Sequence, residues 1–271
     1  MNERLGAFAE SRKPARIAHH PQPPIVRENG AIMVTHSEPQ RDTSSHAQTL
    51  SRGIVAIEIL AASPHPLSID ELAAELGVHR SVAYRILRTL EDHGIVQRSE
   101  SGLLALGPRL ATLARGVYRD LQTAALPELT AITQDLGMTA FIAVLDRAEC
   151  ITLTSVEPQQ THATVAQRPG TKHSLAVGAP GLAIQSILGA DATARLTDAR
   201  SPAELQEIRT RGYATSHNEV IAGLHSVAVP LSIPAHSPGA LAVVYVATTH
   251  DDQEIGTRLA ASVPRIINAL R

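Results

Sequence analysis

A group of arginines and hydroxyl-bearing side chains lies close together in one short segment, residues 79–88. Arginine can donate two parallel hydrogen bonds to guanine or to phosphate, and serine and tyrosine can reach phosphate oxygens or base edges. Apolar residues at positions 82, 83, 86, 87 and 90 would share the opposite face of a helix over this segment. We therefore predict a helix that reads duplex DNA. Its candidate contacts are His79, Arg80, Ser81, Tyr84, Arg85 and Arg88, with Arg98 shortly after it.

Two more helices and a hairpin are predicted around this segment. Apolar residues at helical spacing predict a first helix over 47–62, and they are Leu50, Ile54, Ile57 and Ala61. Ser68-Ile-Asp-Glu71 has the form of a capping box, and the helix that it opens should end at Gly77. The DNA-reading helix follows and should end near Gly94, and two apolar stretches at 95–98 and 103–106 then flank a polar turn. This order of elements is typical of a winged helix-turn-helix domain.

The distribution of charge separates DNA binding from the simpler interpretation of solvated surface arginines. On an isolated amphipathic helix, exposed arginines usually have no partner but water. Here the acidic residues lie on the second helix and at the far end of the third, at Glu91 and Asp92. The start of the third helix is therefore positive, and its free backbone N–H groups favour a phosphate as well. We conclude that this helix is more consistent with DNA recognition than with an ordinary polar surface.

The chain outside this domain divides into a tail, a linker helix and a second domain. Residues 1–45 contain five prolines, mixed charges and little periodicity, so we predict a disordered tail. Translation could start at Met33 instead of Met1. The winged domain then spans 46–107. Helical spacing continues from Pro108 to Leu136, and we expect Pro127 to divide it, which places the linker helix at 108–126 and the second domain at 127–271.

The pattern in the second domain predicts an α+β fold with a mainly antiparallel sheet. Alternating apolar residues predict strands at 140–145, 151–156, 226–231 and 241–246. Helical spacing predicts helices at 179–188, 202–211 and 252–270. The whole chain is thus expected to be a two-domain α+β protein.

Composition argues against several classes of protein. A net charge of −2 and an aromatic content of 2% disfavour a nonspecific nucleic-acid coat and a stacking platform for single strands. The one cysteine, Cys150, permits neither an internal disulfide nor a cysteine-based zinc site. No apolar run is long enough for a membrane span, and the N-terminus lacks the apolar region of a secretory signal. We therefore expect a cytoplasmic protein without membrane association or cofactor. We also expect no metal site in the tail, since His19 and His20 lack partners at ligand spacing.

Motifs of known catalytic chemistry are missing from the chain. It has no nucleophile elbow, no dinucleotide fingerprint, no P-loop and no H-E-x-x-H sequence. Two alternatives to a regulator stay open: a small-molecule-binding enzyme without a recognisable catalytic motif, and a pure protein-interaction module. A basic recognition helix would have no use in the interaction module, and salt-dependent duplex binding would distinguish it from a regulator.

Short motifs along the chain, taken together, resemble those of the IclR family of bacterial regulators, the isocitrate-lyase-regulator type. They run in order from about Gln48 to the C-terminus. They are Leu50-Ser-Arg-Gly-Ile54, Leu72-Ala-Ala-Glu-Leu-Gly77, His79-Arg-Ser-Val-Ala-Tyr-Arg-Ile-Leu87, Leu106-Gly-Pro-Arg-Leu110, Arg211-Gly-Tyr-Ala214, Glu219, Gly223 and Val227-Ala-Val-Pro230. The resemblance implies a homodimer or homotetramer and an operator of two-fold symmetry. It also implies a GAF-like C-terminal domain that binds a small organic acid or a related metabolite.

The resemblance also indicates where such an effector would bind. Family pockets form between a loop, a helix start and the facing strands. The matching positions are His162, Val165 and His173 in the loop, Gly178, Ala179 and Gly181 at the helix start, and Ser216, Leu224, Ser226, Val244 and Val246 on the opposite wall. Backbone N–H groups at a helix start suit a carboxylate, and the serines could orient a polar group.

Some positions depart from the family pattern, and others allow a simpler interpretation. Pro180 lacks an N–H, so one donor of the helix start is missing. Val244 and Val246 stand where some relatives carry hydroxyls, which indicates a more apolar effector, and the stretch 103–106 lacks the basic residues common in the family. His162 and His173 could be exposed loop histidines and Ser226 a satisfied strand hydroxyl. Cys150 could be a small buried residue rather than a redox sensor.

Overall fold

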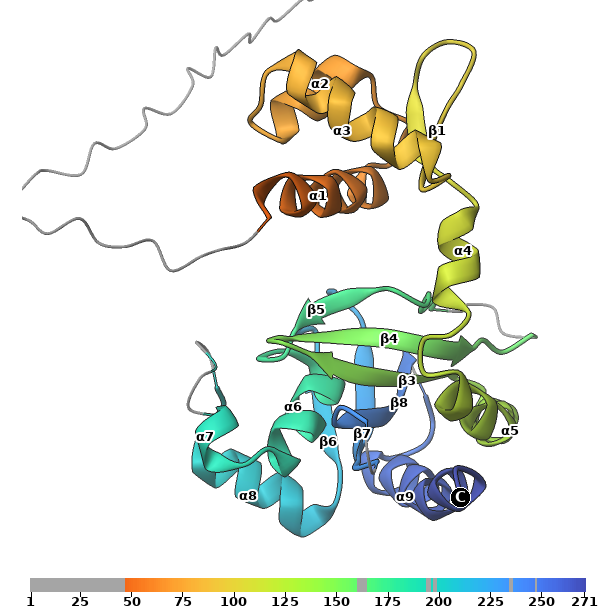
Figure 1. Ribbon diagram of the computed structural model, residues 1–271. Helices are drawn as coiled ribbons and strands as arrows, with labels where there is room; N and C mark the ends of the chain where they lie inside the picture. Colours follow the sequence, from red (N-terminus) through yellow and green to blue (C-terminus); the bar gives the residue numbers. More distant parts are fainter. Residues whose placement is uncertain (1–46, 160–164, 194–195, 197–198, 234–235, 247) are drawn as a thin grey trace, which may run out of the picture. The chain divides into compact units, whose positions relative to one another are not determined.

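The computed structural model describes residues 47–159, 165–193, 196, 199–233, 236–246 and 248–271 (Figure 1). The predicted tail, residues 1–45, and His162 lie outside these ranges. Among the residues that are described, no helix is long and apolar enough to cross a membrane.

The N-terminal part forms the predicted winged helix-turn-helix. Its helices are α1 (Gln48–Ala62), α2 (Ile69–Glu75) and α3 (Arg80–Asp92), and its wing is the hairpin of β1 (Val96–Arg98) and β2 (Leu104–Leu106). The capping box is present, because the Ser68 N–H donates to the Glu71 carboxylate at 2.7 Å and the Glu71 N–H donates to the Ser68 hydroxyl at 3.3 Å. Leu72, Leu87 and Leu104 are fully buried and join the helices to the wing.

Helix α1 forms over the predicted residues but buries a different face. The buried positions are Gly53, Ala56 and Leu60. Leu50 and Ile54, which supplied the apolar period, are 64% and 50% exposed. Ala56 and Leu60 on this face belong to the same buried cluster as Ile86 of α3, and a Cβ on Gly53 would lie at ordinary contact distance, 3.9 Å, from Ile86 Cγ2.

The predicted division of the linker at Pro127 is wrong. The helical stretch breaks instead between α4 (Arg109–Ala114) and α5 (Arg119–Leu136), where Tyr118 adopts φ 49°. Pro127 lies inside α5 and is exposed. A proline inside a helix costs about 3 kcal/mol, but α5 buries Leu121, Leu129 and Ile132 on both sides of it, and their burial offsets that cost. The helical stretch is therefore interrupted at 115–118 rather than at Pro127.

The second domain is built on one antiparallel sheet of order β5-β4-β3-β8-β7-β6. Four of its strands were predicted: β3 (Thr139–Asp146), β4 (Glu149–Val156), β7 (His225–Leu231) and β8 (Gly239–Tyr245). Short strands β5 (Lys172–Ser174) and β6 (Ala214–His217) form the two edges and carry too few residues to show a period. The α+β class with an antiparallel sheet is confirmed.

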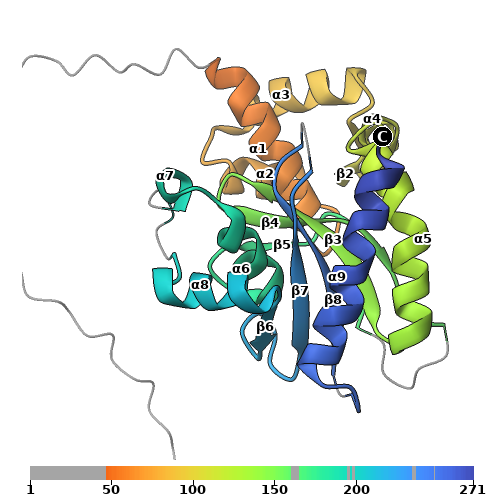
Figure 2. The same ribbon diagram turned by 90° about the horizontal axis from the view of Figure 1, so that it is seen from below.

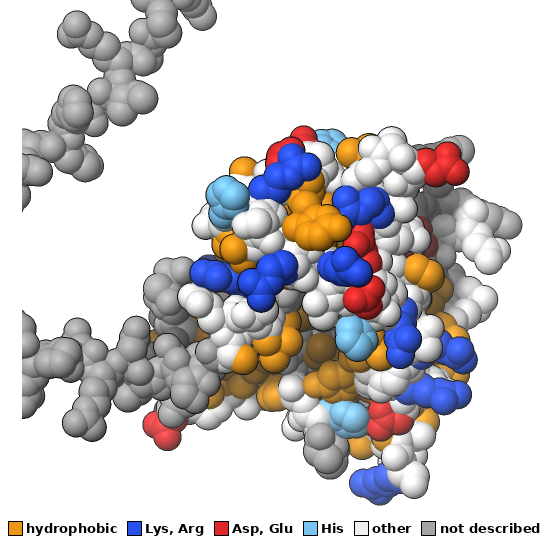
Figure 3. Space-filling model, turned by 45° about the horizontal axis from the view of Figure 1, so that its top comes forward, with side chains coloured by type: hydrophobic (Ala, Val, Ile, Leu, Met, Phe, Trp, Pro, Cys, Tyr) orange, Lys and Arg blue, Asp and Glu red, His pale blue; other side chains and the backbone are white. Residues whose placement is uncertain are grey.

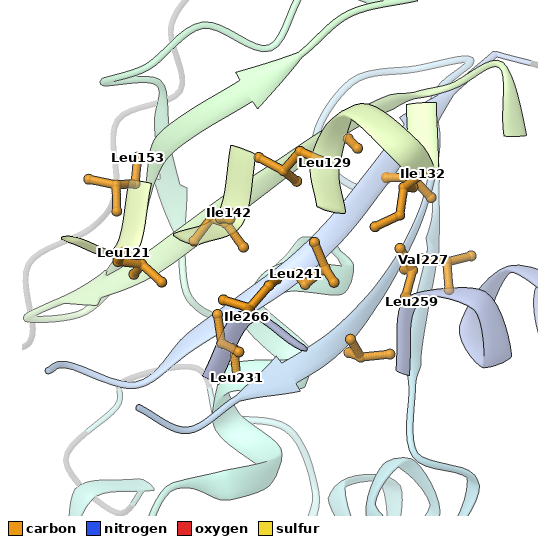
Figure 4. Close-up of a cluster of buried hydrophobic side chains, with 14 of the residues drawn as sticks. Leu121, Leu129, Ile132, Ile142, Leu153, Val227, Leu231, Leu241, Leu259 and Ile266 are labelled. Atoms are coloured by element: carbon orange, nitrogen blue, oxygen red, sulfur yellow. The ribbon is translucent and has the colours of Figure 1, made fainter. Parts of the chain in front are cut away.

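Helices cover both faces of this sheet (Figure 2). Helices α5 and α9 (Asp252–Ala269) pack on one face, over a core that includes Ile142 and Leu241 (Figure 4). Helices α6 (Gly178–Ile187) and α8 (Pro202–Arg211) belong to the other face, and the short helix α7 (Ala190–Thr193) lies between them in sequence. Alanines on strands β7 and β8, among them Ala228 and Ala242, let α6 approach the sheet closely.

Candidate functional site

The N-terminal domain presents the predicted polar face of α3 to solvent. Ala83, Ile86 and Leu87 are buried against α1, α2 and the wing, whereas Tyr84 is 49% exposed. Basic side chains are spread over this domain with acidic ones between them (Figure 3). His79 is the N-cap of α3, and its Nδ1 accepts the Ser81 N–H at 3.3 Å. Local sequence thus fixes the start of α3 and points its polar face away from the core.

Ion pairs divide the candidate DNA-contacting arginines into two groups. Arg80 is bound to both carboxylate oxygens of Asp70, at 2.8 and 2.6 Å. The Arg98 Nε donates to Glu91 at 2.8 Å. Within the part of the chain that the structure describes, Arg85 and Arg88 are exposed and have no such partner. The sequence placed all four arginines in one set, but only Arg85 and Arg88 can meet DNA without giving up an internal ion pair.

The second domain contains an apolar cavity of about 80 Å³ between the start of α6 and strands β5 to β8. Six of the predicted effector residues line it: His173, Gly178, Ser216, Leu224, Ser226 and Val244. Val165, Ala179 and Gly181 lie outside its lining. Val246 is 45% exposed and follows the last residue of β8. The structure thus brings together residues from five separate segments, although some of the predicted wall lies elsewhere.

The register of three neighbouring strands places the serines and a valine on one face. Ser216 is opposite Ser226, and Ser226 is opposite Val244. Residues directly opposite each other point to the same side of a sheet. The Ser226 hydroxyl donates to the Val243 carbonyl at 2.8 Å, so it is a satisfied strand hydroxyl even though it lines the cavity.

The start of α6 does not offer free N–H groups to a ligand, contrary to the prediction. The Gly178 N–H donates to the Glu219 carboxylate at 2.9 Å, and the Ala179 N–H donates to the Ser216 hydroxyl at 3.0 Å. Pro180 has no N–H to donate. The chain itself therefore satisfies the donors that were assigned to an effector carboxylate.

Glu219 lies at the candidate site but was not among the predicted effector residues. It lines the cavity, and Arg200 Nη2 also donates to its carboxylate, at 2.9 Å. The sequence signal for Glu219 was its presence among the family motifs. No local pattern, however, links Glu219 to Gly178, which lies 41 residues away in the sequence. Lys172, Gln167, Thr171 and His225 also line the cavity without having been predicted.

Cys150 is buried, and the structure favours the simpler interpretation of it. Burial raises the pKa of its thiol to about 12. A thiol with such a pKa is almost fully protonated at neutral pH and reacts slowly with oxidants. Among the described residues, no group of histidine, cysteine, aspartate and glutamate side chains has the geometry of a metal site.

Comparison with known proteins gives the same two domains. Residues 49–100 match the IclR helix-turn-helix domain, and residues 117–261 match the C-terminal domain of the bacterial transcriptional regulator IclR. An HTH-type transcriptional regulator of Mycobacterium tuberculosis is 30% identical over 212 residues, which cover 72% of this chain and 81% of that protein. The transcriptional repressor IclR of Escherichia coli is 26% identical, over 68% of this chain and 74% of its own.

Solved structures of similar fold cover both domains. A regulator from Alicyclobacillus acidocaldarius, 24% identical, superimposes with a TM-score of 0.72 over 83% of this chain and 100% of its own. An IclR homolog from Microbacterium hydrocarbonoxydans, complexed with 4-hydroxybenzoate, is 20% identical and superimposes with a TM-score of 0.72. The latter match covers 82% of this chain and 99% of that one.

Proposed function

Because this chain belongs to the IclR family of bacterial transcriptional regulators and is a DNA-binding regulator, we propose that a small organic acid controls its binding to an operator. The acid would bind the cavity between α6 and the sheet. We further propose that the protein acts as a homodimer or homotetramer in the cytoplasm, on an operator with two-fold symmetry. The observation that carries the proposal is an apolar cavity in the second domain of a chain whose first domain presents a DNA-reading helix.

The proposed DNA contact rests on the exposed face of α3. Tyr84, Arg85 and Arg88 would face base edges in the major groove, since they are exposed and lie opposite the buried residues. Arg80 and Arg98 would contact phosphates after exchanging their acidic partners. Fluorescence anisotropy with duplexes from the protein's own promoter, at several salt concentrations, tests this proposal, because phosphate contacts make affinity fall steeply with salt.

The proposed effector class rests on the lining of the cavity. Its walls are largely apolar, with Phe141, Leu224 and Val244 among them, so the effector should have an apolar body. His173 and His225 also line it, together with Lys172, which pairs with Glu149 at 3.2 Å; all three can donate hydrogen bonds to a carboxylate. The one carboxylate among the lining residues, Glu219, is already balanced by Arg200. An organic acid therefore fits this charge pattern, and the aromatic acid bound to the Microbacterium homolog has both features.

Substitution of Ser226 by tryptophan tests the location of the effector site. Ser226 is buried and lines the cavity, so Ser226→Trp should abolish effector binding while operator affinity without effector stays within about threefold. The effector is first found by a thermal-shift screen of organic acids, since a ligand of the folded state raises the melting temperature. Calorimetric titration then compares the variant with the parent.

Two controls keep this test decisive. Ser232→Trp places the same side chain at an exposed position just after β7, outside the lining residues, and should bind effector like the parent. Leu224→Trp narrows the cavity from a half-buried position, and serves if Ser226→Trp does not fold. Parent-like effector affinity in a folded Ser226→Trp protein would place the effector site elsewhere.

A further inference from the structure

The cavity is too small, as it stands, for the effector class proposed above. It encloses about 80 Å³, whereas an apolar cavity of about 150 Å³ is known to take up benzene. Most ligand pockets are larger still, about 300–1,000 Å³. An aromatic or branched organic acid can therefore enter only if one wall of the cavity moves.

The wall with the least support from the core is the loop 218–224, which joins β6 to β7. Its Val220 and Ile221 line the cavity yet are 49% and 58% exposed. The other apolar walls, on β3 and β8 and at the start of α6, belong to buried elements. Movement of those elements would break the sheet or the packing of α6, whereas in the loop Val220 and Ile221 are already exposed and Leu224 alone packs against the core cluster.

Hydrogen bonds inside the loop make it a small rigid unit. The Asn218 N–H donates to the Leu224 carbonyl at 2.9 Å, and the Gly223 N–H donates to the Asn218 side chain at 2.6 Å. The Leu224 N–H donates to the Ile221 carbonyl at 3.2 Å. These bonds close the loop upon itself, so they would survive a movement of the loop as one piece.

Glu219 supplies the charged contacts between this loop and the rest of the domain. One oxygen of its carboxylate accepts both the Gly178 N–H and Arg200 Nη2, each at 2.9 Å. Arg200 is held in turn, because its Nε donates to the Ala176 carbonyl at 3.2 Å and its backbone N–H donates to Gln185 at 3.0 Å. The Glu219 carboxylate therefore binds the loop to Gly178, the first residue of α6, and to Arg200. Arg200 is in turn bonded to Ala176, just before α6, and to Gln185 within it.

The loop also packs directly over the point where it is tied. A Cβ added to Gly178 would lie 2.9 Å from Val220 Cγ2, and Gly178 has φ +80°. Any residue other than glycine at 178 would therefore push against the loop as well as adopt a strained backbone. This close contact keeps the cavity small for as long as Glu219 stays in place.

We propose that Glu219 and Arg200 form a latch that holds the loop 218–224 over the effector cavity, and that Glu219 thereby sets the rate at which an effector enters and leaves. Glu219 is a positioning residue in this scheme, since it acts through Val220 and Ile221. The proposal rests on the proposed function for the identity of the cavity. Entry of the effector requires the Glu219 carboxylate to leave the Gly178 N–H, and the loop to swing outward as a unit.

Hydrogen exchange of the full chain tests the latch without any ligand. In Glu219→Ala, amides of the loop 218–224 and of Gly178 should exchange about tenfold faster or more, while amides in the core of β3 and β8 keep parent rates. Glu204→Ala is the matched control, because Glu204 also pairs with Arg200, at 3.5 Å, but lies on α8 outside the loop. The control should leave loop exchange unchanged. Parent-like exchange in Glu219→Ala, or equal acceleration in both variants, would overturn the latch.

Binding kinetics then separate a gating role from a merely structural one. With 4-hydroxybenzoate as the probe, Glu219→Ala should raise the association and dissociation rate constants about tenfold each, with a smaller change in Kd. A role in stability alone would lower the melting temperature and leave these rates unchanged, which would contradict the proposal. Failure of the Ser226→Trp test with faster loop exchange in Glu219→Ala would refute the effector site and keep the latch. Loss of effector binding in Ser226→Trp together with parent-like loop exchange in Glu219→Ala would refute the latch alone.

Discussion

At the scale of single residues, ion pairing decides which arginine is available to DNA. Arg80 and Arg85 lie on the same helix, but Arg80 is bound to Asp70 whereas Arg85 has no acidic partner within the described residues. An arginine that must first leave a carboxylate gains less from a new anion, because the exchange replaces one charged contact with another. The two residues are therefore expected to differ in energetic weight.

Arg85→Ala should weaken binding to the specific duplex by about 1–3 kcal/mol, the typical value of a bidentate contact to a base. Arg80→Ala should cost less, because in the parent any phosphate contact of Arg80 is gained at the loss of its ion pair with Asp70. Competition anisotropy with specific and scrambled duplexes measures both effects, and size-exclusion chromatography checks that the oligomer is intact. Unchanged operator affinity in a folded Arg85→Ala protein would remove Arg85 from the reading face.

At the scale of elements, the capping box makes α2 sensitive to both sequence and pH. Ser68→Ala should destabilise the N-terminal domain by about 1 kcal/mol at pH 7. Hydrogen bonds from the Ser68 backbone and side chain lower the pKa of Glu71 below its ordinary 4.5. A lowered pKa gives stability that is present above pH 4.5 and is lost as the pH falls through the lower, folded-state value.

The loss of unfolding free energy caused by Ser68→Ala should therefore become smaller as the pH falls below 4.5. Once Glu71 is protonated, the Ser68 hydroxyl no longer stabilises a charged carboxylate. Urea denaturation followed by circular dichroism at pH 7 and pH 3.5 measures this change. Ser51→Ala, at an exposed position inside α1, is a suitable control and should have a small effect at both pH values. An equal cost of Ser68→Ala at the two pH values would contradict the coupling.

The long helix α5 carries a proline whose removal should stabilise the protein. Pro127 is exposed and inside the helix, so Pro127→Ala restores a backbone hydrogen bond without disturbing the buried face. We expect a gain of about 1–3 kcal/mol, measured as a rise in the melting temperature of the second domain. Pro202→Ala is the matched control, because Pro202 opens α8, where a missing N–H costs nothing. A lower melting temperature in Pro127→Ala would show that α5 needs the proline.

At the scale of the whole molecule, the two domains carry DNA binding and the proposed effector binding, and the segment before them is expected to be dispensable. A protein that starts at Met33 should fold and bind the operator like the full chain, because residues 1–32 lack the apolar period needed to dock on a domain. Melting temperature and operator affinity, each within error of the full chain, are the expected results. A loss of about tenfold or more in affinity would show that the tail contributes to DNA binding.

Local sequence was sufficient to predict most elements of this protein. Caps, turns and apolar periods act over a few residues, so the capping box of α2, the three helices of the winged domain and four strands of the sheet could all be predicted. The same local signals failed at Pro127, because the burial of Leu121, Leu129 and Ile132 outweighs the preference of proline. They also failed on α1, where the apolar period marks the exposed face.

Only the tertiary structure decided what the functional groups can do. Family motifs brought Gly178 and Ser216 into one predicted site, but no local pattern links Glu219 to the N–H of Gly178. The same holds for Asp70 and Arg80, whose pairing depends on how α2 and α3 pack. Hydrogen bonds and ion pairs are satisfied by whatever group the fold brings within about 3 Å, whatever its distance in sequence. The residue types were therefore readable from the sequence, while their availability to DNA or to an effector was set by packing.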